Sequence, residues 1–322
     1  MLNWLKRLAA LSAIAVLAAC GSGDDDPPPP GTIAAEATAK GFTALVAAAD
    51  KAGLVPGLND NAATLTVFAP TDAAFASLAT TLGFQSPAAM VAALDGPTLA
   101  KILQYHVLPA KKTAADLVAG GATQPTLYAF EGAATPLALN TTNGVRITDE
   151  VLTQASVTTP DVAASNGVIH VIDKVLVPPG VLNIVQMAQL NPTFSILVEA
   201  VVAANLAGTL SGAGPFTVFA PTNDAFAAAL TELGVTKDQL LADPGLAGIL
   251  TYHAVAGDVR AADVVALPKP AAVATVQGDA FTVGADLGIT DGRARVASLV
   301  ATDVVGSNGV IHVIDKVILP PL

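Results

Sequence analysis

Apolar positions recur at two different periods along the chain, and the change of period separates predicted helices from predicted strands. Spacings of three and four residues indicate helices, and they occur at 42–52, 73–82, 98–107 and 114–118. Short runs rich in valine, threonine and isoleucine predict strands at 65–69, 136–140, 145–148, 156–162 and 168–177. Helices come first and strands last, which predicts an α+β unit with a largely antiparallel sheet.

Polar and conformationally special residues mark the ends of these elements. Pro70 ends the first strand, and Thr71 or Asp72 can cap the helix that follows. Asn166 and Gly167 stand between the last two strands. This pair favours a type I′ hairpin turn, in which both central residues have positive φ. We therefore expect the chain to end this unit in a β-hairpin.

The last predicted strand is apolar on both of its faces. Because side chains alternate along a strand, Val168 and Ile172 lie on one face, and Ile169, Val171 and Val175 lie on the other. A strand that is apolar on both sides is typical of a central position in a covered sheet. We expect helices against one face and a second layer of strands against the other.

The whole pattern occurs twice. Three blocks return in the same order, at offsets of 151, 147 and 142 residues: 66–75 at 217–226, 105–106 at 252–253, and 165–175 at 307–317. Two copies of this length are a tandem pair of ordinary domains rather than a solenoid. We place the first domain at 32–178 and the second at 179–322.

The repeated blocks resemble the signature blocks of fasciclin domains, also called FAS1 domains. They are Thr-Val-Phe-Ala-Pro-Thr, Tyr-His and Asn-Gly-Val-Ile-His-Val-Ile-Asp. The resemblance implies two tandem domains, each a wedge-shaped β-sandwich of mainly antiparallel strands with helices packed on one side. It also implies adhesion or matrix attachment through partners outside the cell. Some fasciclin-like proteins bind carotenoids, so a carrier of a small apolar ligand is an alternative.

Within this resemblance, the Tyr-His block is similar to a segment implicated in receptor binding in animal fasciclin proteins. It makes Tyr105, His106, Tyr252 and His253 candidate interaction residues. The competing interpretation is that these side chains belong to the core, since tyrosine at a helix end is usually buried with its hydroxyl satisfied.

The N-terminus resembles the signal peptide of a bacterial lipoprotein. A basic segment with Lys6 and Arg7 precedes an apolar run at 8–19, too short to span a membrane, and the run ends in Leu-Ala-Ala before Cys20. This predicts a signal peptide at 1–19, a lipid anchor on Cys20 and an acidic, proline-rich tether at 20–31. The residues after Cys20 favour outer-membrane sorting in a Gram-negative host, with the protein on the periplasmic or outer face.

Charge and cysteine content limit the classes of partner and of site that the protein can have. Without Lys6 and Arg7, the chain has 13 basic and 26 acidic side chains, a net charge of −13. Nucleic-acid binding needs a basic surface, so this class is excluded. Cys20 is the only cysteine. No disulfide or thiolate metal site can form within one chain, and each domain must depend on its own apolar core.

Chemistry-bearing residues recur in both copies, which favours structural roles. His170 and His312 lie in apolar strands, and no His-Glu-x-x-His motif accompanies them, so we expect no metal or cofactor. The sequence also contains no nucleophile motif that would indicate an enzyme. The predicted structural motif residues are Thr71, Asp72, Asn166, Gly167, His170, Asp173, Thr222, Asn223, Asn308, Gly309, His312 and Asp315.

The sequence therefore predicts a non-enzymatic, lipid-anchored binding protein outside the cytoplasm. Its expected partner is a cell-surface or matrix protein or a polysaccharide, and two linked domains would gain avidity. The first alternative is the carrier of an apolar ligand such as a carotenoid. The second is a structural lipoprotein of the envelope without a specific ligand.

Overall fold

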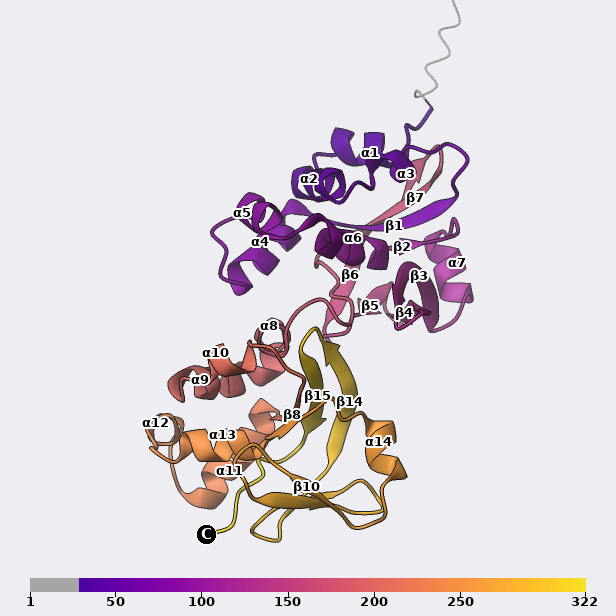
Figure 1. Cartoon of the computed structure of the whole chain (residues 1–322). Coiled ribbons are helices and arrows are strands. Elements are labelled where there is room, and N and C mark those ends of the chain that lie inside the picture. Colours follow the sequence, from indigo (N-terminus) through magenta and orange to yellow (C-terminus); the bar gives the residue numbers. More distant parts are fainter. Residues whose placement is uncertain (1–28) are drawn as a thin grey trace, which may run out of the picture.

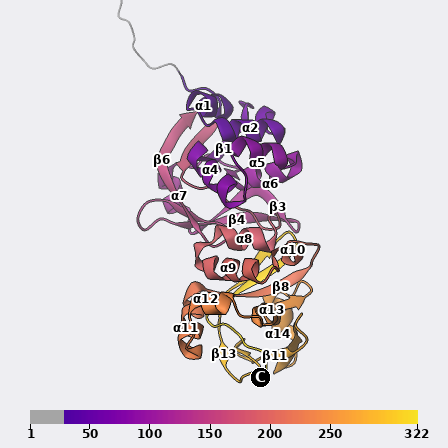
Figure 2. The same cartoon turned by 90° about the vertical axis from the view of Figure 1, so that its left-hand side faces the viewer.

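The computed structural model describes residues 29–322, which form two α+β domains stacked along one axis (Figures 1 and 2). In both views the first domain lies above the second, and the C-terminus lies at the far end of the second domain. The predicted signal peptide, Cys20 and most of the predicted tether lie outside the described residues.

In the first domain most helices come early in the chain, and most strands come late. Its elements are α1 (Ile33–Ala39), α2 (Thr43–Lys51), α3 (Val55–Leu58), β1 (Leu65–Pro70), α4 (Asp72–Thr81), α5 (Pro87–Ala93), α6 (Gly96–Tyr105), β2 (Val107–Leu108), α7 (Ala114–Ala119), β3 (Thr123–Phe130), β4 (Ala133–Asn140), β5 (Arg146–Thr148), β6 (Gln154–Ala164) and β7 (Gly167–Ile172).

The second domain repeats this order with small differences. Its elements are α8 (Ile184–Leu190), the 3₁₀ turn η1 (Pro192–Phe194), α9 (Ser195–Ala203), α10 (Ala207–Leu210), β8 (Phe216–Pro221), α11 (Asn223–Leu233), α12 (Lys237–Leu241), α13 (Leu246–Tyr252), β9 (Ala254–Ala256), α14 (Ala261–Ala266), β10 (Ala271–Ala274), β11 (Ala280–Val283), β12 (Ile289–Thr290), β13 (Val296–Ala297), β14 (Leu299–Gly306) and β15 (Gly309–Ile314).

The strands of each domain form two layers. In the first domain they follow the order β2-β1-β7-β6-β5-β4-β3, in which β1 and β7 are parallel and the other pairs are antiparallel. The long strand β6 pairs with β5 at its start and with β7 over the rest, so it belongs to both layers. In the second domain the layers are separate sheets, β14-β15-β8-β9 and β10-β11-β12-β13.

Each domain buries apolar side chains on both sides of its central strand. In the first domain Ile169 and Val171 of β7 face the helices, whereas Ile172 faces the strands of the second layer. All six residues of β7 and of β15 are buried. The expected central strand, covered by helices on one face and strands on the other, is therefore confirmed. Alternation along the strand produces this arrangement, because successive side chains point to opposite faces.

The structure corrects the expected turn before β7. The two residues between β6 and β7 are Ser165 and Asn166, and neither Asn166 nor Gly167 has positive φ. The expected type I′ turn at Asn166-Gly167 is wrong, although the hairpin forms. Glycine is required at 167 because a Cβ there would lie 2.1 Å from the carbonyl oxygen of Leu65 in β1.

Other differences concern short elements. Strand β7 ends at Ile172, five residues before the predicted end, because the chain bends at 173–174. The helices α1, α3 and α5 and strands β2 and β3 were not predicted. Alanine-rich segments such as 33–39 have weak contrast between apolar and polar positions, so their periodicity is difficult to detect.

The two domains share an apolar contact and several hydrogen bonds. Leu82 and Val151 of the first domain pack into the apolar cluster of the second. The backbone N–H of Val305 donates to the carboxylate of Glu150 at 2.6 Å, and the Asn191 amide donates to the carbonyl oxygen of Val151 at 2.9 Å. These contacts fix the position of the second domain against the first.

Candidate functional site

His106 and its counterpart His253 stabilise the helix-to-strand connection in each domain, between α6 and β2 and between α13 and β9. The Nδ1–H of His106 donates to the carbonyl oxygen of Ile102 at 2.7 Å, and its Nε2 accepts the N–H of Leu176 at 2.9 Å. His253 makes the same two contacts, to Ile249 and Ile318. Burial lowers the pKa of each imidazole from 6.5 to about 4, so both rings are neutral at physiological pH.

His170 and His312 are satisfied in a different way, inside the sandwich. The Nε2–H of His170 donates to the carbonyl oxygen of Lys112 at 2.9 Å, and its Nδ1 accepts the N–H of Asp161 at 3.2 Å. His312 repeats this arrangement with Val259 and Asp303. Burial lowers the pKa of both rings. No ring nitrogen of the four histidines remains free for a metal or a proton transfer.

The side chain of Asn166 joins three segments of the first domain. Its oxygen accepts the N–H of Ile33 at 2.9 Å, and its amide donates to the carbonyl oxygens of Leu58 and Asp60, both at 3.0 Å. Asn308 makes the equivalent three bonds in the second domain. Asparagine suits this position because its short side-chain amide offers one acceptor and two donors.

Asp72 caps a neighbouring helix rather than its own. Thr71 is the N-cap of α4, whereas the Asp72 carboxylate accepts the N–H of Ala44 at 2.9 Å, near the start of α2. In the second domain Thr222 caps α11, and Asn223 accepts the N–H of Ile196 at 3.0 Å. These contacts hold two helices of the cap together.

The other repeated motif residues also serve the backbone. Asp173 accepts the N–H of Ser156 at 2.7 Å, and Asp315 accepts that of Ser298 at 2.7 Å. Gly309 lies against the Phe216 carbonyl oxygen, 2.0 Å from where a Cβ would be, as Gly167 does against Leu65.

The candidate interaction residues are buried. The exposed fractions of Tyr105, His106, Tyr252 and His253 are 2%, 1%, 0% and 1%. The Tyr252 hydroxyl donates to the carbonyl oxygen of Ala280 at 3.1 Å, inside the sandwich. Burial raises the pKa of both tyrosines. In this structure the four side chains therefore lie in the cores of the domains, as the competing interpretation expects, and not on the surface.

Two buried carboxylates were missed by the sequence analysis. Asp149 forms an ion pair with Lys174 at 2.6 Å and accepts the N–H of Val177 at 3.0 Å. Asp291 does the same with Arg295 at 2.6 Å and with Leu319. Their recurrence could have been noticed, but they lie outside the three repeated blocks, and their basic partners differ in type and spacing.

Among residues 29–322 there is no group of three or more histidine, cysteine, aspartate or glutamate side chains that could hold a metal ion. Nor is any helix in this range long and apolar enough to cross a membrane.

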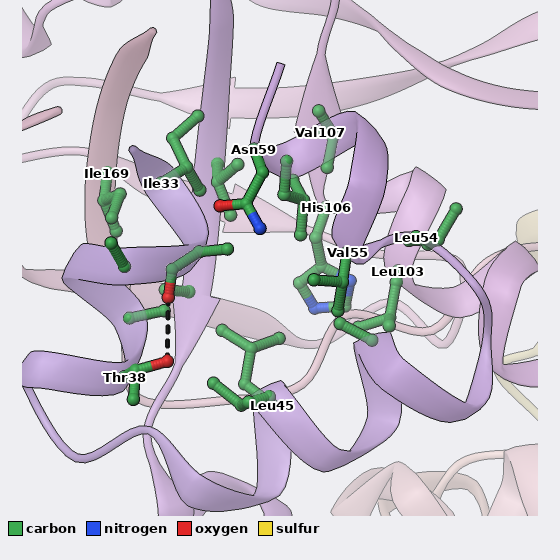
Figure 3. Close-up of a pocket in the computed structure, with 18 residues that line it drawn as sticks. Ile33, Thr38, Leu45, Leu54, Val55, Asn59, Leu103, His106, Val107 and Ile169 are labelled. Atoms are coloured by element: carbon green, nitrogen blue, oxygen red, sulfur yellow. Dashed lines mark hydrogen bonds between the residues drawn. The ribbon is translucent and has the colours of Figure 1, made fainter. Parts of the chain in front are cut away.

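An apolar cavity lies under the helical cap of the first domain (Figure 3). It has a volume of about 260 Å³ and lies between α1, α2 and α3 and strands β1 and β7. Figure 3 shows Ile33, Leu45, Val55, Leu103 and His106 around it. No lining side chain carries a charge.

Glu150 occupies the contact between the domains. Its carboxylate accepts the N–H of Val305 at 2.6 Å, across the boundary. Burial raises the pKa of Glu150 to about 7, and the nearby Asp149 adds to the increase, while the Val305 N–H opposes it. Close by, Arg260 of the second domain contacts Glu131 of the first at 3.1 Å. Glu131 and Glu150 of the first domain thus both contact groups of the second domain.

Comparison with known proteins agrees with this architecture. Residues 40–178 and 192–320 each match the family model described as the fasciclin domain. Over 145 residues the chain is 48% identical to Protein sll1483 of Synechocystis sp. (strain ATCC 27184 / PCC 6803 / Kazusa), covering 44% of this chain and 75% of that protein.

A second relative is the cell surface glycolipoprotein MPB83 of Mycobacterium bovis (strain BCG / Tokyo 172 / ATCC 35737 / TMC 1019). It is 37% identical over 139 residues, which are 41% of this chain and 57% of that protein. Among solved structures, a FAS1 domain pair from the insect cell adhesion molecule Fasciclin I aligns with a TM-score of 0.46 and 19% identity, covering 88% of this chain and 98% of that one. Because the family model matches both repeats and together most of the chain, the protein belongs to the fasciclin (FAS1) family.

Proposed function

We propose that the protein is a non-enzymatic, lipid-anchored adhesion protein that binds a surface macromolecule through the exposed faces of its two domains. One observation carries this proposal: the repeated polar residues are engaged in backbone contacts in both domains, as His106 and Asn166 are. They contribute stability and leave no group for chemistry. Binding by the folded surface is the function that such a pair of domains supports.

The partner class follows from charge and attachment. A net charge of −11 for the chain disfavours nucleic acid and anionic surfaces. A cell-surface or matrix protein, or a polysaccharide, fits an extracytoplasmic protein with two linked domains. Two sites on one tether raise avidity through effective concentration, even when each site binds weakly.

Attachment through Cys20 is part of the proposal. The MPB83 relative is a cell surface glycolipoprotein by its name, and in this chain Cys20 follows a segment that resembles a lipobox. Cells that express the chain with a palmitate analogue should label it, and Cys20→Ser should remove both the label and the membrane fraction. Equal labelling of the Cys20→Ser chain would contradict the anchor.

Adhesion is tested by comparing cells that carry the anchored chain with cells that carry the Cys20→Ser chain. The anchored chain should increase aggregation or attachment to a coated matrix or polysaccharide. Purified residues 29–322, added in excess, should inhibit the attachment because they occupy the same partner. Attachment that is equal in both strains, or that the purified fragment does not change, would refute adhesion.

A second candidate function is transport or storage of a small apolar ligand. The observation in its favour is the apolar cavity of about 260 Å³ in the first domain. Native mass spectrometry of residues 29–322, purified without detergent from the original host, should then show a discrete excess mass. A clean mass would refute this candidate and would leave adhesion or a purely structural role.

A further inference from the structure

The helical caps of the two domains differ in one respect: the first is hollow and the second is filled. The cavity in the first domain has about 260 Å³, and the equivalent hollow in the second has about 40 Å³. Both lie under corresponding helices and against corresponding strands, and His106 and His253 line them at matching positions. The difference therefore arises from side chains and not from the backbone plan.

Two substitutions between the repeats account for part of this difference. The first helices of the caps correspond because Ile33 and Ile184 both donate to the repeated asparagine, which pairs Ala34 with Val185. The second helices, α2 and α9, both have nine residues, which pairs Ala49 with Val201. All four of these side chains line the two hollows. Each valine adds two methyl groups where the first domain has open space.

The chemistry of the lining defines the ligand. The cavity wall holds no charged side chain. Both nitrogens of His106 are occupied by backbone groups, and the Thr38 hydroxyl donates to the carbonyl oxygen of Ala34 at 2.9 Å (Figure 3). A water molecule needs two to four polar partners to be held in a cavity, and of these groups only the acceptor side of the Thr38 hydroxyl remains. The interior therefore favours an uncharged apolar molecule over water.

The volume limits the size of that molecule. An apolar cavity of about 150 Å³ accommodates benzene, so about 260 Å³ suits a molecule of roughly ten carbon atoms. A carotenoid has several times as many carbons and cannot be enclosed. Asn59 lines the cavity as an exposed side chain, so it stands at the mouth, and its oxygen is already engaged by the Thr32 hydroxyl at 2.6 Å.

We propose that the first domain alone binds one small, uncharged apolar molecule of roughly ten carbon atoms in the cavity beneath α1, α2 and α3. The inference rests on the second candidate function and makes it more specific, because it names the domain, the residues and the ligand class. The second domain has the same architecture but lacks the space, so it serves the fold and the adhesive surface only.

Naphthalene is a suitable probe because it is uncharged and has ten carbons. Its fluorescence can be followed in residues 29–322, since the only tryptophan of the chain is Trp4. Titration of the two-domain protein should give saturable binding with one site per chain. The variant Ala34→Val/Ala49→Val, which copies the second domain, should weaken binding by about tenfold or more.

Two further variants serve as controls. Ala49→Val alone tests the cavity if the double variant does not fold, which circular dichroism would show, and it too should weaken binding. Ala47→Val places the same added methyl groups on the exposed face of α2 and should leave binding unchanged. Absence of saturable binding to the unmodified protein, or binding that Ala49→Val does not change, would overturn the inference.

Failure of this inference can be distinguished from failure of the carrier function itself. If naphthalene does not bind but native mass spectrometry shows an apolar ligand, the carrier function stands and its assignment to this cavity falls. If naphthalene binds to the cavity and the native protein is unliganded, the site is supported and natural carriage is refuted.

Discussion

Asn166 offers the sharpest test of the reasoning, because one side chain ties the start of α1 and the loop after α3 to the β6–β7 turn. Asn166→Ala removes three hydrogen bonds of 2.9 to 3.0 Å. It also leaves the N–H of Ile33 without a partner at a residue that is only 2% exposed. Each bond contributes about 1 kcal/mol net, so the expected loss of stability is about 3 kcal/mol.

The assay is urea unfolding of residues 29–322, followed by tyrosine fluorescence. Tyr105 and Tyr128 report on the first domain and Tyr252 on the second. With a slope of about 2 kcal/mol per molar urea, the midpoint of the first domain should fall by roughly 1.5 M. Hydrogen exchange measured on peptides should show the lost protection in α1 and α3 first.

Two variants control this experiment. Asn308→Ala removes the equivalent three bonds and should move the transition of the second domain by a similar amount. Asn61→Ala changes an exposed asparagine nearby and should alter stability by less than about 0.5 kcal/mol. If Asn166→Ala also shifts stability by less than about 0.5 kcal/mol, the Asn166 side chain does not hold these three segments together.

Three other outcomes follow from the same contacts. Gly167→Ala should destabilise the first domain by at least about 2 kcal/mol, measured by urea unfolding, because its Cβ would meet the Leu65 carbonyl oxygen at 2.1 Å; an effect no larger than that of an exposed glycine would contradict this. Because the folded pKa of Glu150 is raised to about 7, its contribution to stability is present below pH 4.5 and is lost as the pH rises to 7. Glu150→Gln should therefore become progressively more stable than the unmodified protein between pH 5 and pH 8, by up to about 3 kcal/mol, and a constant difference would refute the burial argument. His106 and His253 give stability the opposite pH dependence, because burial lowers their pKa to about 4. Chemical denaturation should show stability falling as the pH drops from 6.5 to 4. The fall should be smaller in a His106→Gln chain that still folds.

The sequence alone determined the architecture. The two repeats defined two domains, the order of helical and strand periods defined an α+β fold, and the apolar character of 168–172 on both faces predicted the central strand. These features are local or periodic, so a single chain displays them directly. The structural interpretation of the histidines was also available, because mid-strand positions among valine and isoleucine leave few alternatives.

Only the tertiary structure decided which groups meet. The sequence indicated a tight turn at Asn166 and Gly167, but their identities are set by contacts with Ile33 and Leu65, more than 100 residues away. The cavity depends on Ala34 and Ala49, which are unremarkable in an alanine-rich chain. A cavity is defined by what several segments together fail to fill, and no local pattern encodes that.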